Sequence, residues 1–148
     1  MIIKLIKDIK KIDLEIINKL LYQLDPKSSP LTRNSLKKIL TQRNVTIIGC
    51  YKNNQPNSLI ATISLVFYQT FSGYRCRIED FVVEKKERGK GIGTKLLKKA
   101  ILLAKNKKVA FIELTSRPER KIANALYQKM SFQIKKTNVY RYNLYKKL

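Results

Sequence analysis

Three alternating glycines give the clearest chemical signal in this sequence. They occur in the run Arg88-Gly89-Lys90-Gly91-Ile92-Gly93-Thr94, which follows an apolar strand-like stretch (78–83) and opens a helix-like one. The start of a helix carries unpaired backbone N–H groups and the positive end of a dipole, so it favours an anion. Glycine lets the backbone approach a ligand closely and adopt positive φ. With two cationic side chains and a hydroxyl, the run predicts a diphosphate-binding loop.

Two common phosphate-binding loops do not fit this run. A Walker A loop ends in Gly-Lys-Ser/Thr, whereas Gly93 is followed by Thr94-Lys95 in the reverse order. A dinucleotide fingerprint has its third glycine one position later, where Thr94 stands. It also belongs to a parallel βαβ unit, and the elements before residue 88 read instead as an antiparallel meander.

The residue types also limit the acid–base chemistry. The chain has no histidine, which excludes imidazole bases and histidine metal sites. We expect no metal centre, and Cys50 and Cys76 make neither a metal nor a disulfide framework. Without a histidine to activate them, these cysteines are expected to be small core residues rather than nucleophiles.

The elements that must position the loop follow from hydrophobic periodicity. Strands are predicted over residues 1–7, 44–51, 58–68, 74–83, 110–115, 132–136 and 139–145, and helices over 10–24, 32–42, 92–105 and 122–129. This order predicts an α/β (α+β) domain with a mixed, mostly antiparallel sheet of about seven strands and about four helices. At 148 residues, the chain (1–148) is expected to form one domain.

The net charge of +22 favours polyanionic partners, such as nucleic acids or phosphorylated cofactors. A/T-rich coding would explain the many lysines but not the shortage of glutamate. No apolar run is long enough to span a membrane, and the N-terminus carries too many charges for a signal peptide. We therefore expect an intracellular protein in a reducing compartment, such as the cytoplasm.

The glycine run also resembles a family motif. Residues 88–93 match the Arg/Gln-x-x-Gly-x-Gly/Ala pattern that marks acyl-CoA binding in the GNAT superfamily of N-acetyltransferases. A second match is Asn124-Ala125-Leu126-Tyr127, followed by a turn in which Ser131 stands where the family has glycine. The resemblance covers nearly the whole chain and is strongest over residues 78–142.

The resemblance implies the GNAT fold, in which two central strands splay apart and acetyl-CoA lies in the gap. Backbone groups of Phe81, Val82 and Val83 would bind pantetheine. The amides of Arg88, Gly89, Lys90, Gly91, Ile92, Gly93 and Thr94 would bind the diphosphate. Asn124 would hold the pantetheine arm or fix its own helix. The basic cluster Arg117, Arg120 and Lys121 either meets the 3′-phosphate of CoA or is a solvated face.

The resemblance also implies catalytic residues. Tyr127 is the expected acid for the leaving thiolate, because a tyrosine pKa of ~10 is only slightly above a thiol pKa of ~8.5. Glu79 is the first candidate for the base, Glu113 the second and Asp80 the third. Strand alternation places Glu79 and Asp80 on opposite faces of the sheet, so that only one of them would face the acceptor.

The sequence does not identify the amine that would accept the acetyl group. The Glu79-Asp80 pair resembles that of diamine and polyamine acetyltransferases, which suggests a small cationic amine, whereas the net charge disfavours one. Protein lysines, peptide N-termini, amino sugars and antibiotics are alternatives. Members of the family often pair through sheet edges, so the resemblance also allows a homodimer. Two other readings are a basic nucleic-acid- or ribosome-associated protein on a GNAT scaffold, which is not favoured, and a catalytically weak acyl-CoA sensor.

Overall fold

The computed structural model describes residues 1–144. It contains the strands β1 (Ile2–Ile6), β2 (Val45–Tyr51), β3 (Leu59–Thr70), β4 (Gly73–Val83) and β5 (Ile112–Glu113), and the helices α1 (Leu14–Leu24), α2 (Arg33–Thr41), α3 (Ile92–Asn106) and α4 (Lys121–Lys129). Contacts divide the chain into two compact units, residues 1–115 and residues from 116 onward, and each is described by itself. The α+β class and the antiparallel meander predicted from the sequence are confirmed.

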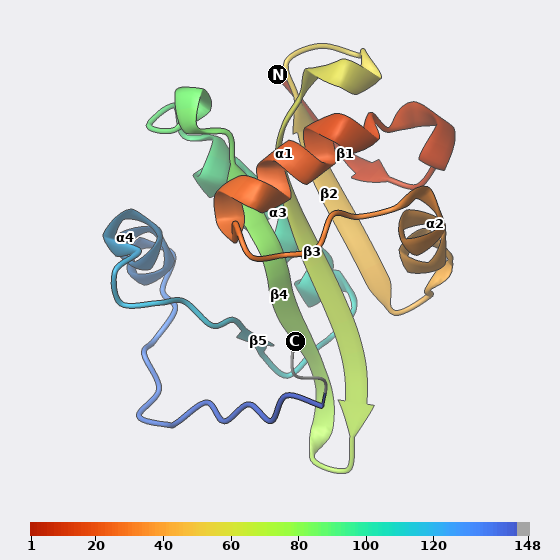
Figure 1. Cartoon of the computed structure of the whole chain (residues 1–148). Helices are drawn as coiled ribbons and strands as arrows, with labels where there is room; N and C mark the ends of the chain where they lie inside the picture. The colour runs from red at the N-terminus through yellow and green to blue at the C-terminus, as the bar shows by residue number, and fades with distance from the viewer. Residues whose placement is uncertain (145–148) are drawn as a thin grey trace. The chain divides into compact units, whose positions relative to one another are not determined.

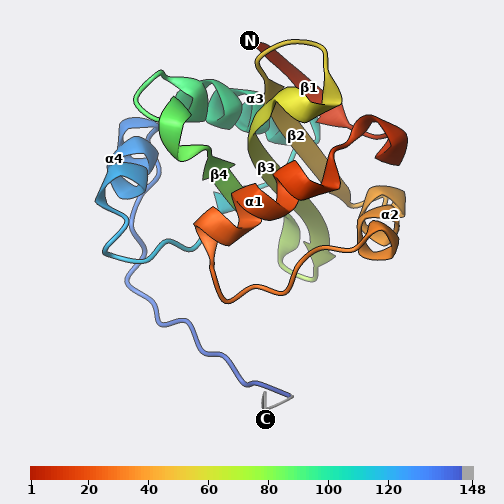
Figure 2. The same ribbon diagram turned by 45° about the horizontal axis from the view of Figure 1, so that its top comes forward.

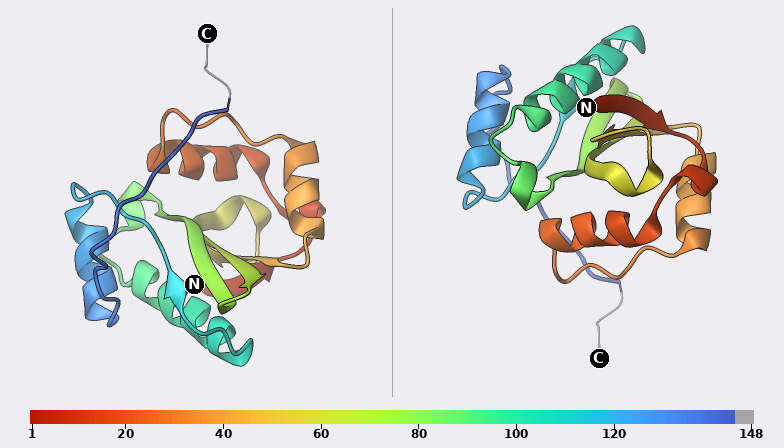
Figure 3. Two further views of the ribbon diagram at one scale, coloured as in Figure 1. Left: turned by 90° about the horizontal axis from the view of Figure 1, so that it is seen from below. Right: turned by 90° about the horizontal axis from the view of Figure 1, so that it is seen from above.

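The first unit is a sheet covered on both faces by helices. Its strands lie in the order β1-β2-β3-β4-β5, antiparallel from β1 to β4 and parallel between β4 and β5. Helices α1 and α2 cover one face and α3 covers the other (Figures 1 and 3). Figure 2 shows α1 lying across the strands, where it contacts β3 and β4. We refer to the side covered by α1 and α2 as the α1 face.

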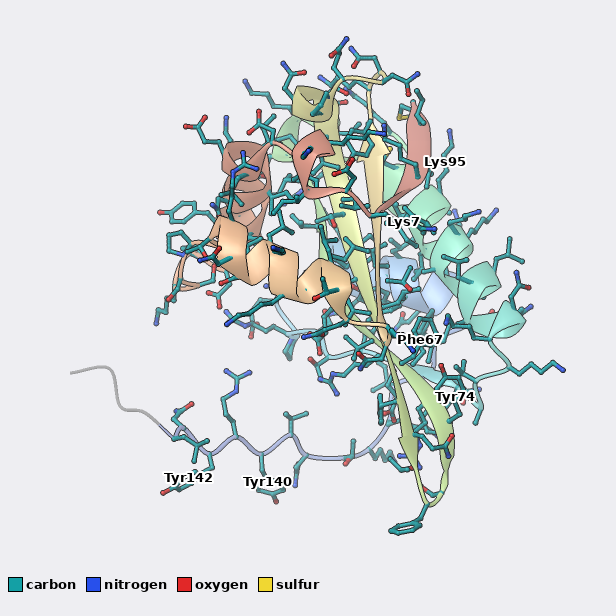
Figure 4. The ribbon with its side chains drawn as sticks, turned by 90° about the vertical axis from the view of Figure 1, so that its right-hand side faces the viewer. Lys7, Phe67, Tyr74, Lys95, Tyr140 and Tyr142 are labelled. Atoms are coloured by element: carbon teal, nitrogen blue, oxygen red, sulfur yellow. The ribbon has the colours of Figure 1, made fainter. Side chains whose placement is uncertain are left out.

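Burial follows this two-faced design. Beneath α1 and α2, apolar side chains form one cluster that includes Leu20, Leu36, Tyr51 and Val82. The inner stripe of α3 is fully buried, as its helical periodicity requires, whereas its lysines at 95, 98, 99 and 105 are exposed. At the distal end of the β3–β4 hairpin, the rings of Phe67 and Tyr74 lie 6.2 Å apart (Figure 4).

The start of α1 differs from the prediction of a helix from residue 10. Residues Ile9–Lys11 form a separate 3-10 turn, and α1 begins only after Asp13. The Asp13 carboxylate accepts hydrogen bonds from the N–H groups of Glu15 and Ile16, so it caps the helix there. Helical periodicity alone does not distinguish a helix from a 3-10 turn followed by a capped helix.

A β-bulge interrupts β4 and decides where its side chains point. Thr62 pairs with Val82 and Ser64 pairs with Glu79, so two residues of β4 stand opposite one of β3. Within the bulge, Asp80 has φ of +49°, a conformation that few non-glycine residues adopt. Before the bulge the buried residues are Cys76 and Ile78, whereas after it Val82 packs in the cluster beneath α1. The alternation therefore changes face at Asp80.

The second unit contains α4 and an extended segment. The strands predicted over 132–136 and 139–145 are absent from its described residues, and Tyr145 lies outside them. The sheet of the described chain thus has five strands rather than about seven. Along this segment Tyr140 and Tyr142 are exposed (Figure 4). A β-strand forms only where the backbone groups of a neighbouring strand are available for hydrogen bonding. An alternating sequence favours an extended chain but does not provide that neighbour.

Candidate active site

The glycine loop has the conformation that its sequence predicts. Gly89 and Gly91 have φ values of +79° and +75°, and Gly91 is the N-cap of α3. No atom lies within 4 Å of a Cβ built on either residue, so open space adjoins the loop on that side. The 15-residue helix α3 begins directly after the left-handed Gly91, and the N–H groups of its first turn have no partner within the helix. The loop therefore has the form of an anion-binding helix start.

Two lysines are fixed beside this loop by a carboxylate that the motif does not include. Glu87 is only 9% exposed, and its carboxylate bonds Lys52 Nζ at 2.6 Å and Lys90 Nζ at 2.9 Å. These hydrogen bonds lower the pKa of Glu87 to about 2, whereas desolvation has a smaller, opposing effect despite the limited exposure. Neither Glu87 nor Lys52 was expected from the sequence to be a site residue. The only signal was a single acid inside a lysine-rich turn.

The end of β4 leads directly into the loop. Val83 O accepts a hydrogen bond of 3.0 Å from Arg88 Nε, which turns the chain back toward the strand. Strand β5 pairs with β4 only at Cys76 and Arg77, although β4 continues to Val83. Phe81, Val82 and Val83 thus lie beyond the short β4–β5 pairing.

Helix α1 is attached to the same end of β4. Gln23 donates from Nε2 to Glu84 Oε2 at 2.9 Å, and its Oε1 accepts from the N–H of Lys85 at 3.0 Å. These two hydrogen bonds connect residues more than sixty positions apart. They hold the C-terminal end of α1 against the segment that carries the glycine loop.

Three of the candidate side chains lie on the α1 face. Ile47, which packs into the cluster beneath α1, pairs with Ser64, and Ser64 pairs with Glu79. Directly paired residues share a face of a sheet. Glu79 also bonds Arg77, whose partner in β5 is Glu113. Glu79 and Glu113 are therefore brought to the same face.

The expected separation of Glu79 and Asp80 is wrong, because the bulge ends the alternation between them. Asp80 is exposed and its carboxylate bonds Ser64, on the α1 face. Although the residue is exposed to solvent, protein atoms around its carboxyl partly desolvate it, and this desolvation raises the pKa of Asp80. The like charge of Glu79 raises the pKa further, and the hydrogen bond from Ser64 acts in the opposite direction. All three carboxylates are thus on one face.

The remaining site residues belong to the second unit. Tyr127 is half-buried on α4, with its ring 6.0 Å from that of Phe132. Burial raises the pKa of its hydroxyl, and the positive charge of Arg120 opposes this effect. Asn124 donates from Nδ2 to the carbonyls of Arg117 at 3.0 Å and Pro118 at 3.4 Å, so its amide fixes the turn before α4.

The turn after α4 shows how serine replaces the expected glycine. Ser131 has φ of +67°. The N–H of Phe132 donates to Tyr127 O at 3.0 Å, which closes the end of the helix. The basic residues Arg117, Arg120 and Lys121 lie at the start of the same helix.

Neither cysteine is suited to covalent chemistry. Both are buried free thiols, and burial raises the pKa of Cys50 and raises that of Cys76 to about 11. Each is a neutral thiol near neutral pH. Within residues 1–144, no group of three or more metal-binding side chains comes together, and no helix is long and apolar enough to cross a bilayer.

Comparison with known proteins agrees with this geometry. Residues 14–132 match the model of the acetyltransferase (GNAT) family. The fold is similar to that of glucosamine-6-phosphate N-acetyltransferase from Arabidopsis thaliana, with a TM-score of 0.77, 23% identity and coverage of 96% of this chain and 99% of that one. An acetyltransferase of Trypanosoma brucei has a TM-score of 0.78 at 22% identity, covering 97% and 99% of the two chains.

A third similar structure is an aminoglycoside acetyltransferase from an uncultured soil metagenomic sample, solved in complex with trehalose. Its TM-score is 0.82 at 17% identity, covering 98% of this chain and 96% of that one. No curated protein matches this chain in sequence. The chain thus has the fold of these acetyltransferases. Because the family model spans most of its length, the chain belongs to the GNAT acetyltransferase family.

Proposed function

We propose that this protein transfers the acetyl group of acetyl-CoA to a primary amine by direct attack within a ternary complex. The observation that carries the proposal is the left-handed glycine loop at the start of α3, with open space beside Gly89 and Gly91. Members of this family generally use acetyl-CoA, and a helix start of this kind suits its diphosphate.

The residues of the loop fit such a ligand. The amides of residues 88–94 would bind the diphosphate, with Lys90 held near them by Glu87. Backbone groups of Phe81, Val82 and Val83 would bind pantetheine, since β4 extends beyond its pairing with β5. A backbone N–H near Val83 would stabilise the negative charge that develops on the thioester oxygen. When bound, acetyl-CoA supplies an activated acyl group.

The proton transfers are assigned to side chains. Tyr127 would protonate the departing thiolate, and its burial supports this role because a raised pKa keeps the hydroxyl protonated. The candidates for the base are the carboxylates of Glu79, Glu113 and Asp80. Asn124 would act through the turn that it fixes before α4. The cytoplasm is the compartment that best suits a protein with two buried thiols.

A substrate screen tests the proposal. Thiol release from acetyl-CoA would be measured with glucosamine 6-phosphate, sisomicin, spermidine and a lysine-containing peptide, and acetyl-CoA binding would be measured by isothermal titration calorimetry. The first two acceptors are chosen from the names and ligands of structurally similar acetyltransferases. We expect micromolar binding of acetyl-CoA and thiol release with at least one amine. Binding without thiol release would instead favour an acyl-CoA sensor.

A further inference from the structure

Glu79, the first candidate for the base, is already engaged. The Nε of Arg77 donates to Glu79 Oε1, and the Nη2 of Arg77 reaches Thr115 Oγ1 at 3.4 Å. Arg77 also faces Glu113 across the β4–β5 pairing. The carboxylate oxygen that accepts the guanidinium N–H is not available to the acceptor ammonium, so only one oxygen of Glu79 remains for that role. The geometry therefore leaves Glu79 less suited to act as the base.

Asp80 differs from Glu79 in position and in partner. It occupies the bulge of β4 with φ of +49°, and it is exposed to solvent. Its carboxylate bonds the hydroxyl of Ser64, which is only 7% exposed. The bulge and the hydrogen bond to Ser64 together give this carboxylate a defined direction, toward the α1 face.

We infer that Asp80 takes the proton from the acceptor ammonium and that Arg77 and Ser64 position the two neighbouring carboxylates for this division of roles. The inference rests on the proposed acetyl transfer. Asp80 is then the catalytic base, and Arg77 and Ser64 are positioning residues. Glu79 supplies a negative charge next to the ammonium rather than accepting its proton.

The Asp80 carboxylate accepts one proton from the ammonium and becomes a carboxylic acid, which leaves a free electron pair on nitrogen. That pair forms the N–C bond with the thioester carbonyl carbon, and the C–S bond breaks with its electrons on sulfur. The sulfur gains a proton from Tyr127, and the nitrogen loses its second proton, which returns through solvent to the Tyr127 phenolate. Asp80 then returns its proton to solvent.

The surroundings of Asp80 determine how its protonation responds to mutation. Next to Asp80 on the α1 face are the ionisable groups of Glu79 and Arg77 on β4 and of Glu113 on β5, and β3 contributes the hydroxyl of Ser64. Arg75 of β4 and Lys4 of β1 lie farther away on the same face. On α1, Gln23 is hydrogen-bonded to Glu84. The ionisable side chains of this helix are exposed, namely Glu15, Lys19 and Tyr22. Desolvation is the main cause that raises the pKa of Asp80, which makes its carboxylate a stronger base than usual.

The test compares Asp80→Asn with the matched variant Glu79→Gln. Rates with the best acceptor among glucosamine 6-phosphate, sisomicin, spermidine and the peptide would be measured across pH. Asp80→Asn should lower kcat/KM near neutral pH by about 10²-fold or more. The rate should recover as the pH approaches the pKa of the amine itself, ~10, because the acceptor is then already deprotonated. Glu79→Gln should raise KM for the acceptor, because the negative charge beside the ammonium is lost, whereas its kcat near neutral pH should fall much less than that of Asp80→Asn.

The variants Ser64→Ala and Glu79→Gln should give opposite pH shifts that a merely structural role would not produce. Ser64→Ala removes a hydrogen bond that lowers the pKa of Asp80, so the acidic limb of the kcat/KM profile should move to higher pH. Glu79→Gln removes a like charge that raises the same pKa, so this limb should move to lower pH. Circular dichroism and acetyl-CoA titration would establish that each variant folds and binds.

The outcomes separate this inference from the proposed function. An Asp80→Asn protein that folds and keeps the wild-type rate near neutral pH would overturn the inference alone. So would a large loss in Glu79→Gln with Asp80→Asn intact, which would return the role to Glu79. Wild-type protein that releases no thiol with any of the four acceptors would overturn acetyl transfer to those amines and the inference with it.

Discussion

At the scale of single residues, the chemical behaviour of each site side chain depends on the residues that contact it. Three carboxylates lie on one face of the sheet, those of Glu79, Asp80 and Glu113. Glu79 is paired with Arg77, whereas Asp80 is hydrogen-bonded to Ser64. Their chemical roles therefore differ although their types are nearly the same. The same holds for Tyr127, whose hydroxyl pKa is raised by burial.

The role of Tyr127 gives the first prediction. Tyr127→Phe should lower kcat by about 10²-fold, because the thiolate loses its proton donor. The affinity for acetyl-CoA should change much less, since the aromatic ring remains. Steady-state kinetics and calorimetric titration of the same preparation would measure both. Tyr22→Phe, at a tyrosine that is 63% exposed on α1, is the control and should behave as wild type. Wild-type turnover in Tyr127→Phe would refute the assignment.

The second prediction follows from the backbone conformation of Gly91. Gly91→Glu should abolish measurable binding of acetyl-CoA, because the new side chain would occupy the space beside the helix start and place a negative charge against the diphosphate. Gly91 has φ of +75°, so part of the loss would come from strain. Gly91→Asn separates the two causes, since asparagine tolerates positive φ and carries no charge. It should bind more weakly than wild type but more tightly than Gly91→Glu.

At the scale of elements, the ends of helices and strands place the site. The glycine loop starts α3, the bulge reorients β4, and Gln23 attaches the end of α1 to the segment after β4. Each feature lies where a helix or strand ends or becomes irregular, and there it directs the backbone or a side chain toward the site. The regular parts of the same elements supply the buried core.

The turn after α4 gives a prediction at this scale. Ser131→Gly should stabilise the protein by about 0.5–1 kcal/mol, because glycine adopts positive φ at no steric cost. Gln128→Gly, at an exposed position inside the same helix, is the matched control and should destabilise by a similar amount. Urea denaturation of both variants would measure the change. Destabilisation by Ser131→Gly would show that its hydroxyl matters more than its backbone strain.

At the scale of the whole molecule, charge is the dominant property. Basic residues outnumber acidic ones 32 to 10, and the exposed side of α3 carries lysines without an acidic partner in that helix. With so few acidic residues, a carboxylate that is buried or paired can have several cations nearby and can fix their positions. Glu87 is the clearest case, since it bonds two lysines beside the loop.

The pairing of Glu87 predicts how stability depends on pH. Its pKa falls from 4.5 to about 2 on folding, so the stabilisation is complete above 4.5 and is lost as pH falls toward 2. In Glu87→Gln this part of the pH dependence should be absent. Urea unfolding at several acidic pH values would compare the two proteins, with Glu15→Gln, at an exposed position, as the control. Parallel wild-type and Glu87→Gln curves would contradict the assignment.

The net charge predicts a difference between two kinds of ligand. Any binding of duplex DNA should fall by a factor of about 10² or more between ~50 and ~200 mM salt, because it depends on counterion release. Acetyl-CoA binding should change by less than about tenfold, since backbone amides contribute much of it. Gel shift and calorimetry across the same salt series would test this. Tight DNA binding that persists at high salt would favour the nucleic-acid reading instead.

The sequence by itself determined most element boundaries and the glycine loop. Hydrophobic periodicity and turn residues act locally, so β2, β3, β4 and α3 lie within about two residues of their expected limits. The family motif could likewise be read directly, because a helix start needs its glycines at fixed neighbouring positions.

Only the tertiary structure decided the bulge, and with it the side of the sheet that Asp80 faces. A bulge arises from the register between two strands, and register is a property of the pair rather than of either segment. The partners of Glu79 and Glu87 and the absence of strand pairing over residues 132–144 have the same cause. They depend on contacts between residues far apart in sequence, which no local pattern records.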